Sequence, residues 1–226
     1  MGAARNAFTR WAPLLTAAPL AASCAFAPYR RALARGDEAL HEGRYEAARR
    51  LYGEAAKKAA DWQAPADLAR ARHASAACAL LLGRPADAEA DYRAALDALQ
   101  AAGAPASDRA ATLGDLANAL ALEGRPSEAA AAYRKAAAEY AKAPDASALE
   151  RSKTLAELGQ LELAQRRYPE AEQAYSEAIS LRERALGDGH PSLGPLLEDL
   201  ASALTGQGKL REAESAQRRA KEIRER

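Results

Sequence analysis

The feature that most constrains this chain is a sequence frame that occurs five times. Its copies are GRYEAARRLYGEA (43–55), GRPADAEADYRAA (83–95), GRPSEAAAAYRKA (124–136), RRYPEAEQAYSEA (166–178) and GKLREAESAQRRA (208–220). Successive copies begin 40 to 42 residues apart. A regular period of this length indicates a stacked array, in which each repeat buries the apolar face of its neighbour.

Each copy has a physical interpretation as a turn followed by a helix. The opening glycine is expected in the turn, and Tyr45, Tyr168 or Leu210 starts the helix that follows. This helix then carries, on one face, an alanine, a tyrosine four residues later and a second alanine three residues after that; the alanines allow close contact between helices. These positions hold Ala48, Ala88, Ala129, Ala171 and Ala213, then Tyr52, Tyr92, Tyr133 and Tyr175, then Ala55, Ala95, Ala136, Ala178 and Ala220.

The segments before the frames carry leucines and small residues at helical spacing. These stripes are Leu113, Leu116, Ala117 and Leu120, then Leu155, Leu158 and Gly159, then Leu197, Leu200, Ala201 and Leu204. Aromatic residues make up 5% of the chain, so large side chains cannot fill the core. Alanine is the best helix former. We therefore predict an all-α fold of closely packed helix pairs.

The frame resembles the tetratricopeptide repeat (TPR), a helix–turn–helix unit, over residues 29–226. That resemblance implies a right-handed TPR superhelix, an α-solenoid. The segment SLRERALGDGHPSLGPLLEDLASAL (180–204) is more specifically similar to the long repeats of kinesin light chains and their bacterial relatives. Arg166 replaces the usual glycine and Gln217 the usual tyrosine; Gln217 fits a terminal helix that faces water. The five expected repeats are about 29–62, 69–102, 110–143, 152–185 and 194–226.

The N-terminal segment has the layout of a secretory signal peptide. Arg5 and Arg10 supply positive charge, no charged residue follows from Trp11 to Ser23, and small residues precede Cys24. The end of this segment, LAASC, resembles the lipobox of bacterial lipoproteins. In that family the cysteine is acylated and becomes the first mature residue. The resemblance implies a signal peptide at 1–23 and a lipidated tether at 24–28, and Ala25 implies the outer membrane, on its periplasmic face.

Three other interpretations of this segment stay open. The uncharged run extends to Tyr29 and is long enough for a membrane-spanning helix, although Pro13, Pro19 and Pro28 interrupt it. A plain cleaved signal with an incidental Cys24 is the second, and a cytoplasmic protein with an unstructured leader is the third.

Catalytic and metal-binding patterns are missing from the sequence. The chain contains neither a glycine-rich phosphate loop nor a Gly-x-Ser-x-Gly motif, and His41, His73 and His190 are far apart. Cys78 lies among alanine and leucine, as a small buried hydrophobe does. The 32 basic and 31 acidic side chains do not favour a nucleic-acid partner. We expect no enzyme activity, no cofactor and no metal.

The TPR resemblance also implies a binding surface for an extended peptide or a partner protein. In that family, four positions of each first helix line a concave groove, and Asn118 matches an asparagine that bonds the ligand backbone. The alternative is that these side chains are merely solvated. The residues at those positions are Arg70, His73, Asn118, Lys153, Gln160, Glu198, Ser202 and Thr205.

Two functions follow from these features. The first is a lipid-anchored scaffold in envelope assembly, with pilus, secretin, outer-membrane or cell-wall machinery as partner. The second is a cytoplasmic TPR adaptor or regulatory module without a lipid anchor.

Overall fold

The computed structural model describes residues 27–143 and 148–225, and the predicted signal peptide and Cys24 lie outside this range. The described residues form ten α-helices and no strand, as predicted from the repeat frame. The helices are α2 (Pro28–His41), α3 (Tyr45–Asp61), α4 (Pro65–Leu81), α5 (Pro85–Ala101), α6 (Ala106–Leu122), α7 (Pro126–Tyr140), α8 (Ala148–Ala164), α9 (Tyr168–Leu186), α10 (Leu193–Gly206) and α11 (Leu210–Arg224).

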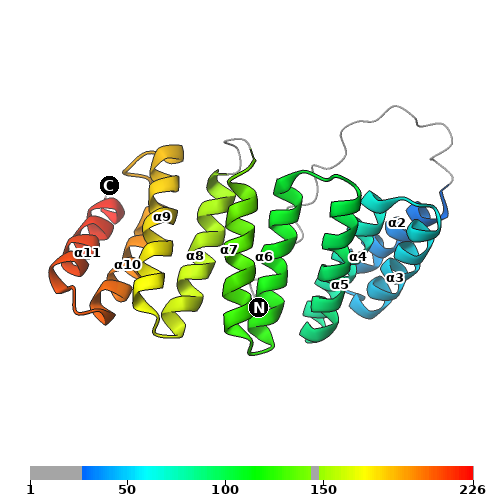
Figure 1. The fold of residues 1–226 in the computed structure, drawn as a ribbon, viewed down its shortest axis with the longest axis horizontal. Helices are drawn as coiled ribbons and strands as arrows, with labels where there is room; N and C mark the ends of the chain where they lie inside the picture. The colour runs from blue at the N-terminus through cyan, green and yellow to red at the C-terminus, as the bar shows by residue number, and fades with distance from the viewer. Residues whose placement is uncertain (1–26, 144–147, 226) are drawn as a thin grey trace. The chain divides into compact units, whose positions relative to one another are not determined.

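These helices belong to two compact units, residues 1–125 and residues 126–226. Unit 1 contains α2 to α6 and unit 2 contains α7 to α11. Within each unit, every helix packs against the next one along the chain, in antiparallel hairpins (Figure 1). The first helices of successive repeats also touch, α2 with α4 and α8 with α10. Each unit is therefore a stack of helices, as expected for a solenoid.

The residue that opens each copy of the frame lies in the turn between the two helices of a repeat, as predicted. Its φ angle is 73° at Gly43, 72° at Gly83, 75° at Gly124 and 78° at Gly208. Only glycine adopts this left-handed region without steric cost. Arg166 adopts the same conformation, with φ of 59°, although this backbone costs other residues about 1–2 kcal/mol.

The turns also satisfy backbone groups at the helix ends. The amide of the residue after the turn donates to a carbonyl five residues earlier. Examples are Arg44 N to Ala39 O at 2.8 Å and Arg167 N to Glu162 O at 2.9 Å. Gln63, between the first two repeats, has φ of 50°, and the amide of the next residue, Ala64, donates to the carbonyl of Ala59, five residues earlier. One turn geometry therefore connects helices both within and between repeats.

The alanines and tyrosines of the frame lie in the core, together with leucines of the first helices. All the frame alanines are buried, and the four frame tyrosines are at most 4% exposed. The Tyr52 ring lies against Gly36, where an added Cβ would come within 2.6 Å of Tyr52 Cε1. Likewise, a Cβ added at Gly159 would come within 2.9 Å of Tyr175 Cε2. The first helix therefore needs a very small residue wherever the tyrosine of the second helix rests on it.

Two single-residue predictions are also confirmed. Gln217 is exposed on α11, as expected for the last helix of a stack. Cys78 is fully buried, and burial raises the pKa of its thiol to about 12, so it packs as a small apolar side chain.

The described residues include no helix long and apolar enough to cross a bilayer.

The contact between Gly36 and Tyr52 gives a first prediction. Gly36→Ala should destabilise unit 1 by about 1–3 kcal/mol, because the new methyl group overlaps a buried ring. Gly53→Ala in α3 is the matched control, since a Cβ there meets nothing within 4 Å. It should be neutral or stabilising by up to about 1 kcal/mol. Urea unfolding followed by circular dichroism measures both, and equal effects would contradict the packing argument.

Candidate functional site

The predicted peptide-contact residues fall into both units, and in unit 1 they begin with Arg70 on α4. Arg70 is exposed, and its Nη2 donates to Asp37 Oδ2 on α2 at 2.8 Å. The hydroxyl of Tyr52 on α3 donates to the other oxygen of Asp37 at 2.7 Å. Burial, and then Asp37, raise the pKa of Tyr52. Three helices thus meet at one carboxylate, with the arginine on the outer side.

Asp37 is a residue that the sequence analysis missed. It occupies the same place relative to its frame as Asn118, Gln160 and Ser202 do to theirs, so the period could have identified it. Asn118 itself is half-buried on α6.

His73 differs from the other predicted residues because it lies in the interior of unit 1. It is 5% exposed, and its Nδ1 is 3.4 Å from Thr112 Oγ1 while its Nε2 is 3.4 Å from Asp115 Oδ2. The ring packs edge-on against Tyr92, at 5.2 Å between centroids. Burial lowers the pKa of His73 to about 3, so the ring is neutral. His73 therefore does not belong to a surface that a partner could reach.

In unit 2 the predicted residues lie on α8 and α10, two first helices that touch each other. Lys153 Nζ lies 3.9 Å from Glu157 Oε1, and Gln160 is exposed one turn beyond. Glu198 is exposed and forms an ion pair with Arg224 of α11. We call this surface the α8–α10 face and define it by Lys153, Gln160, Glu198, Ser202 and Thr205.

Two hydroxyl groups of the α8–α10 face bond within their own helix. Ser202 Oγ donates to Glu198 O at 3.0 Å, and Thr205 Oγ1 donates to Ala201 O at 2.8 Å. Both oxygens keep acceptor capacity for a ligand. The α8–α10 face is therefore polar, exposed and of mixed charge, as a surface for a peptide backbone needs to be.

Buried carboxylates hold the helices behind these surfaces, and no sequence pattern marked them. Asp91 on α5 accepts from Arg72 Nη1 at 2.8 Å and from Ser75 Oγ at 2.7 Å. Glu162 on α8 is fully buried and binds Arg134 of α7 and Arg167, with Arg167 Nη1 at 3.4 Å. Both acids are neutralised by arginine, so their role is structural.

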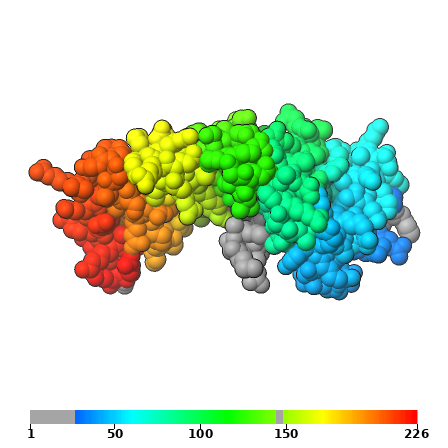
Figure 2. Space-filling model, turned by 90° about the horizontal axis from the view of Figure 1, so that it is seen from below, coloured from blue at the N-terminus to red at the C-terminus, as the bar shows by residue number. Residues whose placement is uncertain are grey.

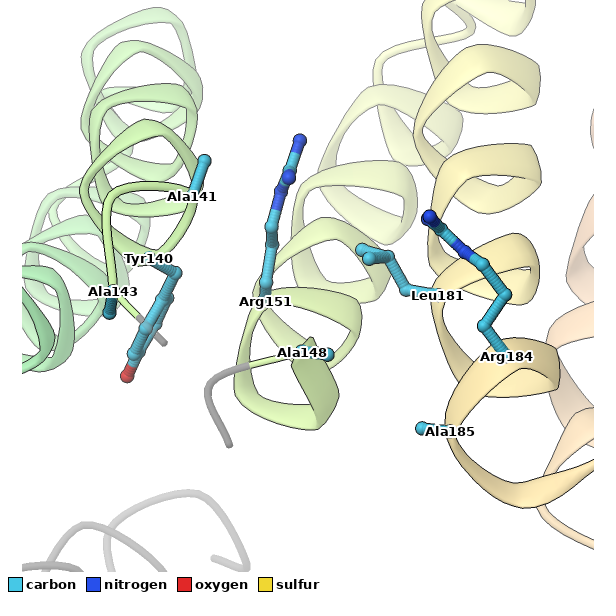
Figure 3. Close-up of a pocket in the computed structure, with 8 residues that line it drawn as sticks. All are labelled: Tyr140, Ala141, Ala143, Ala148, Arg151, Leu181, Arg184 and Ala185. Carbon is cyan, nitrogen blue, oxygen red and sulfur yellow. The ribbon is translucent and has the colours of Figure 1, made fainter. Parts of the chain in front are cut away.

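A cavity of about 440 Å³ lies in unit 2 between the end of α7, the start of α8 and the later turns of α9. Figure 3 shows Leu181 between the side chains of Arg151 and Arg184 in that view. Arg151 binds Glu177, and Arg184 Nε donates to Ser180 O at 3.2 Å. The cavity combines apolar carbon with guanidinium groups. It is lined by Tyr140, Ala141, Ala143, Ala148, Arg151, Leu181, Arg184 and Ala185.

None of the predicted contact residues lines this cavity, so the sequence analysis missed it. No sequence pattern distinguishes the alanines that line this cavity from the alanines of the core. Among the described residues, no group of three or more His, Cys, Asp or Glu side chains could hold a metal ion.

Comparison with known proteins agrees with the repeat architecture. Residues 150–226 match the tetratricopeptide repeat family model. No curated protein sequence matches the chain. The match confirms the predicted TPRs in the C-terminal part of the chain.

Solved structures extend the fold similarity to most of the chain. The structure of BtubC (BKLC) from P. vanneervenii has a TM-score of 0.70 and 21% identity, covering 84% of this chain and 76% of its own. The kinesin light chain TPR-like repeats of Podosopora anserina give 0.67 and 20%, covering 86% and 94%. MamA gives 0.67 and 18%, covering 87% and 92%. The fold is thus the TPR solenoid, with kinesin-light-chain repeats among its neighbours.

Burial of His73 predicts a specific dependence of stability on pH. The folded pKa of about 3 lies below the ordinary 6.5, so the unfolded chain binds an extra proton as pH falls below 6.5. His73 should then cost unit 1 about 1.4 kcal/mol per pH unit between pH 6.5 and about 5. Thermal unfolding of wild type and His73→Gln measures this, and the variant should lose less stability over that interval.

His41→Gln is the control for this measurement, because His41 is exposed at the end of α2. It should keep the wild-type pH dependence. A His73→Gln variant that loses as much stability as wild type between pH 6.5 and 5 would contradict the burial argument.

Proposed function

We propose that this chain, which folds as a TPR array, is an outer-membrane-anchored periplasmic lipoprotein. In this proposal it is a protein-interaction scaffold in envelope assembly, with pilus, secretin, outer-membrane or cell-wall proteins as partners. The observation that carries the proposal is the combination of a lipobox-like LAASC segment with a repeat array that begins four residues after Cys24. A tether this short would hold the array at the membrane surface.

The anchor part of the proposal follows from the energetics of acyl chains. One acyl chain binds a bilayer only marginally, whereas two or more hold a protein stably. Acylation of Cys24 on its thiol and on its new amine would supply that number. The anchored chain would then need no membrane-spanning helix.

The scaffold part of the proposal rests on the surfaces of unit 1 and unit 2. TPR arrays bind partners on the surface formed by their first helices. Here that surface exposes Arg70 in unit 1 and the α8–α10 face in unit 2. The acids and bases on it are mixed, which favours recognition of a peptide backbone and polar side chains over one charge sign. We propose binding, not catalysis, as the activity.

The anchor predicts where the protein is found in the native cell. Full-length protein with a C-terminal tag should fractionate with outer membranes and incorporate a labelled palmitate analogue. Cys24→Ala should lose both properties, because it has no thiol to acylate. Cys78→Ala is the matched control and should keep both, since that thiol is buried. Wild-type protein that remains soluble and unlabelled would support the cytoplasmic adaptor instead.

The first-helix surface predicts the behaviour of a double variant. Asn118→Ala with Lys153→Ala should weaken cross-linked capture of the partner at least about tenfold, the effect of losing two polar contacts. Arg211→Ala with Arg218→Ala removes two exposed arginines from α11 and should capture normally. Circular dichroism of both variants checks that helicity is kept. Equal capture by the two double variants would exclude the first-helix surface as the binding site.

A further inference from the structure

One end of unit 1 exposes a large aromatic side chain. Trp62 follows the last turn of α3 and is 56% exposed. Its ring packs edge-on against Tyr29 in the first turn of α2, with 6.1 Å between centroids and 75° between planes. This contact places the start of α2, the end of α3 and the start of α4 together. We call this region the Trp62 end of unit 1.

The helix turns next to the two rings carry basic side chains. Arg30 and Arg31 are exposed in the first turn of α2, beside Tyr29. Lys57 and Lys58 lie in the last turns of α3, and the Trp62 amide donates to Lys58 O at 3.1 Å. The acids of this region are Asp61, Asp67 and Glu54, whose carboxylate lies 3.9 Å from Lys58 Nζ, so four bases face three acids. The Trp62 end is therefore an aromatic surface with a positive balance.

The Trp62 end is also where the chain enters unit 1 from its N-terminal segment. Pro28 begins α2, and Cys24 is four residues earlier. Four residues span at most about 14 Å when fully extended. In Figure 2 the blue and cyan surface of α2 and α3 forms the end of unit 1 away from α6. A lipid on Cys24 would thus hold this end of unit 1 close to the bilayer.

We propose that the Trp62 end is a membrane-contact surface that seats unit 1 on anionic phospholipid headgroups. Tryptophan and tyrosine favour the interface between headgroups and acyl chains because each has an apolar ring and a polar atom. Basic residues near an anionic surface each gain about 1 kcal/mol. This inference rests on the proposed lipid anchor for the orientation of unit 1. The contact itself depends only on Trp62 and the arginines beside it.

The test uses fluorescence of the full chain with vesicles. The chain has two tryptophans, Trp11 and Trp62, so Trp11→Phe leaves Trp62 as the only emitter. Vesicles contain equal parts of phosphatidylglycerol and phosphatidylcholine, with brominated acyl chains as quencher. We expect a blue shift and quenching of Trp62 emission, and neither with phosphatidylcholine alone. The comparison with phosphatidylcholine alone separates contact through the basic side chains, which needs anionic lipid, from insertion of the uncharged N-terminal segment, which does not.

A matched control moves the emitter to another exposed apolar site of unit 1. Leu122 is 68% exposed at the end of α6. The chain with Trp11→Phe, Trp62→Phe and Leu122→Trp should show no quenching at position 122, measured at lipid concentrations where co-sedimentation shows that this variant is bound to the same vesicles. Emission from position 62 that is no more quenched than emission from position 122 would overturn the proposal. So would Trp62 emission that vesicles leave unchanged.

Charge reversal tests the electrostatic part. With Arg30→Glu and Arg31→Glu together, the concentration of anionic lipid needed for half-maximal quenching of Trp62 should rise at least about tenfold. Arg211→Glu with Arg218→Glu on α11 should leave it unchanged. An equal effect of both pairs would mean that net charge, and not the Trp62 end, controls binding, and this would overturn the proposal.

The cell fractionation described above separates failure of this inference from failure of the anchor. If Cys24→Ala releases the protein but Trp62 is not quenched, the anchor stands and the membrane-contact surface does not. If Trp62 is quenched but Cys24 carries no lipid in cells, the contact stands and the anchor does not.

Discussion

The structure depends on the contact between a tyrosine ring in the second helix of a repeat and a residue almost without side chain in the first. Tyr52 lies on Gly36 and Tyr175 on Gly159, at distances that leave no room for a methyl group. In the other repeats the corresponding first-helix residues are buried alanines: Ala76, Ala117 and Ala201. With so few aromatic residues in the chain, the tyrosine gives each of the first four helix pairs a large buried side chain that alanine packing cannot supply, whereas the fifth pair has the exposed Gln217 at that position.

Polar links then join one repeat to the next. The residue after each turn is basic in every copy of the frame, and several of these cations reach the preceding repeat. Arg84 binds Glu46, Arg125 binds Glu89 and Lys209 binds Glu172. Lys209 and Gln207 together lower the pKa of Glu172. Such exposed pairs contribute little energy each, so their effect is on register more than on stability.

These two kinds of contact leave the outer surfaces of the helices free to vary. Arg70, the α8–α10 face and the cavity beside Arg151 are all built on helices that the core already fixes. The Trp62 end adds a half-exposed tryptophan where the chain enters unit 1. A scaffold tethered nearby would present its first-helix surfaces to partners while this end meets the lipid.

The sequence by itself determined the helix pairs, their turns and most of the core. The period is visible because every repeat buries the same alanines and the first four repeats bury the same tyrosine. The turn requires glycine, or tolerates Arg166 at a cost. The placement of polar side chains was decided only by tertiary structure. His73 shares a helix position with groove residues of the TPR family, yet Thr112, Asp115 and Tyr92 enclose it from other helices. Spacing along one helix fixes the direction in which a side chain points, but the neighbouring helices decide whether it meets solvent. Trp62 and Tyr29 are likewise far apart in the sequence, and only the packing of α2 against α3 brings their rings into contact.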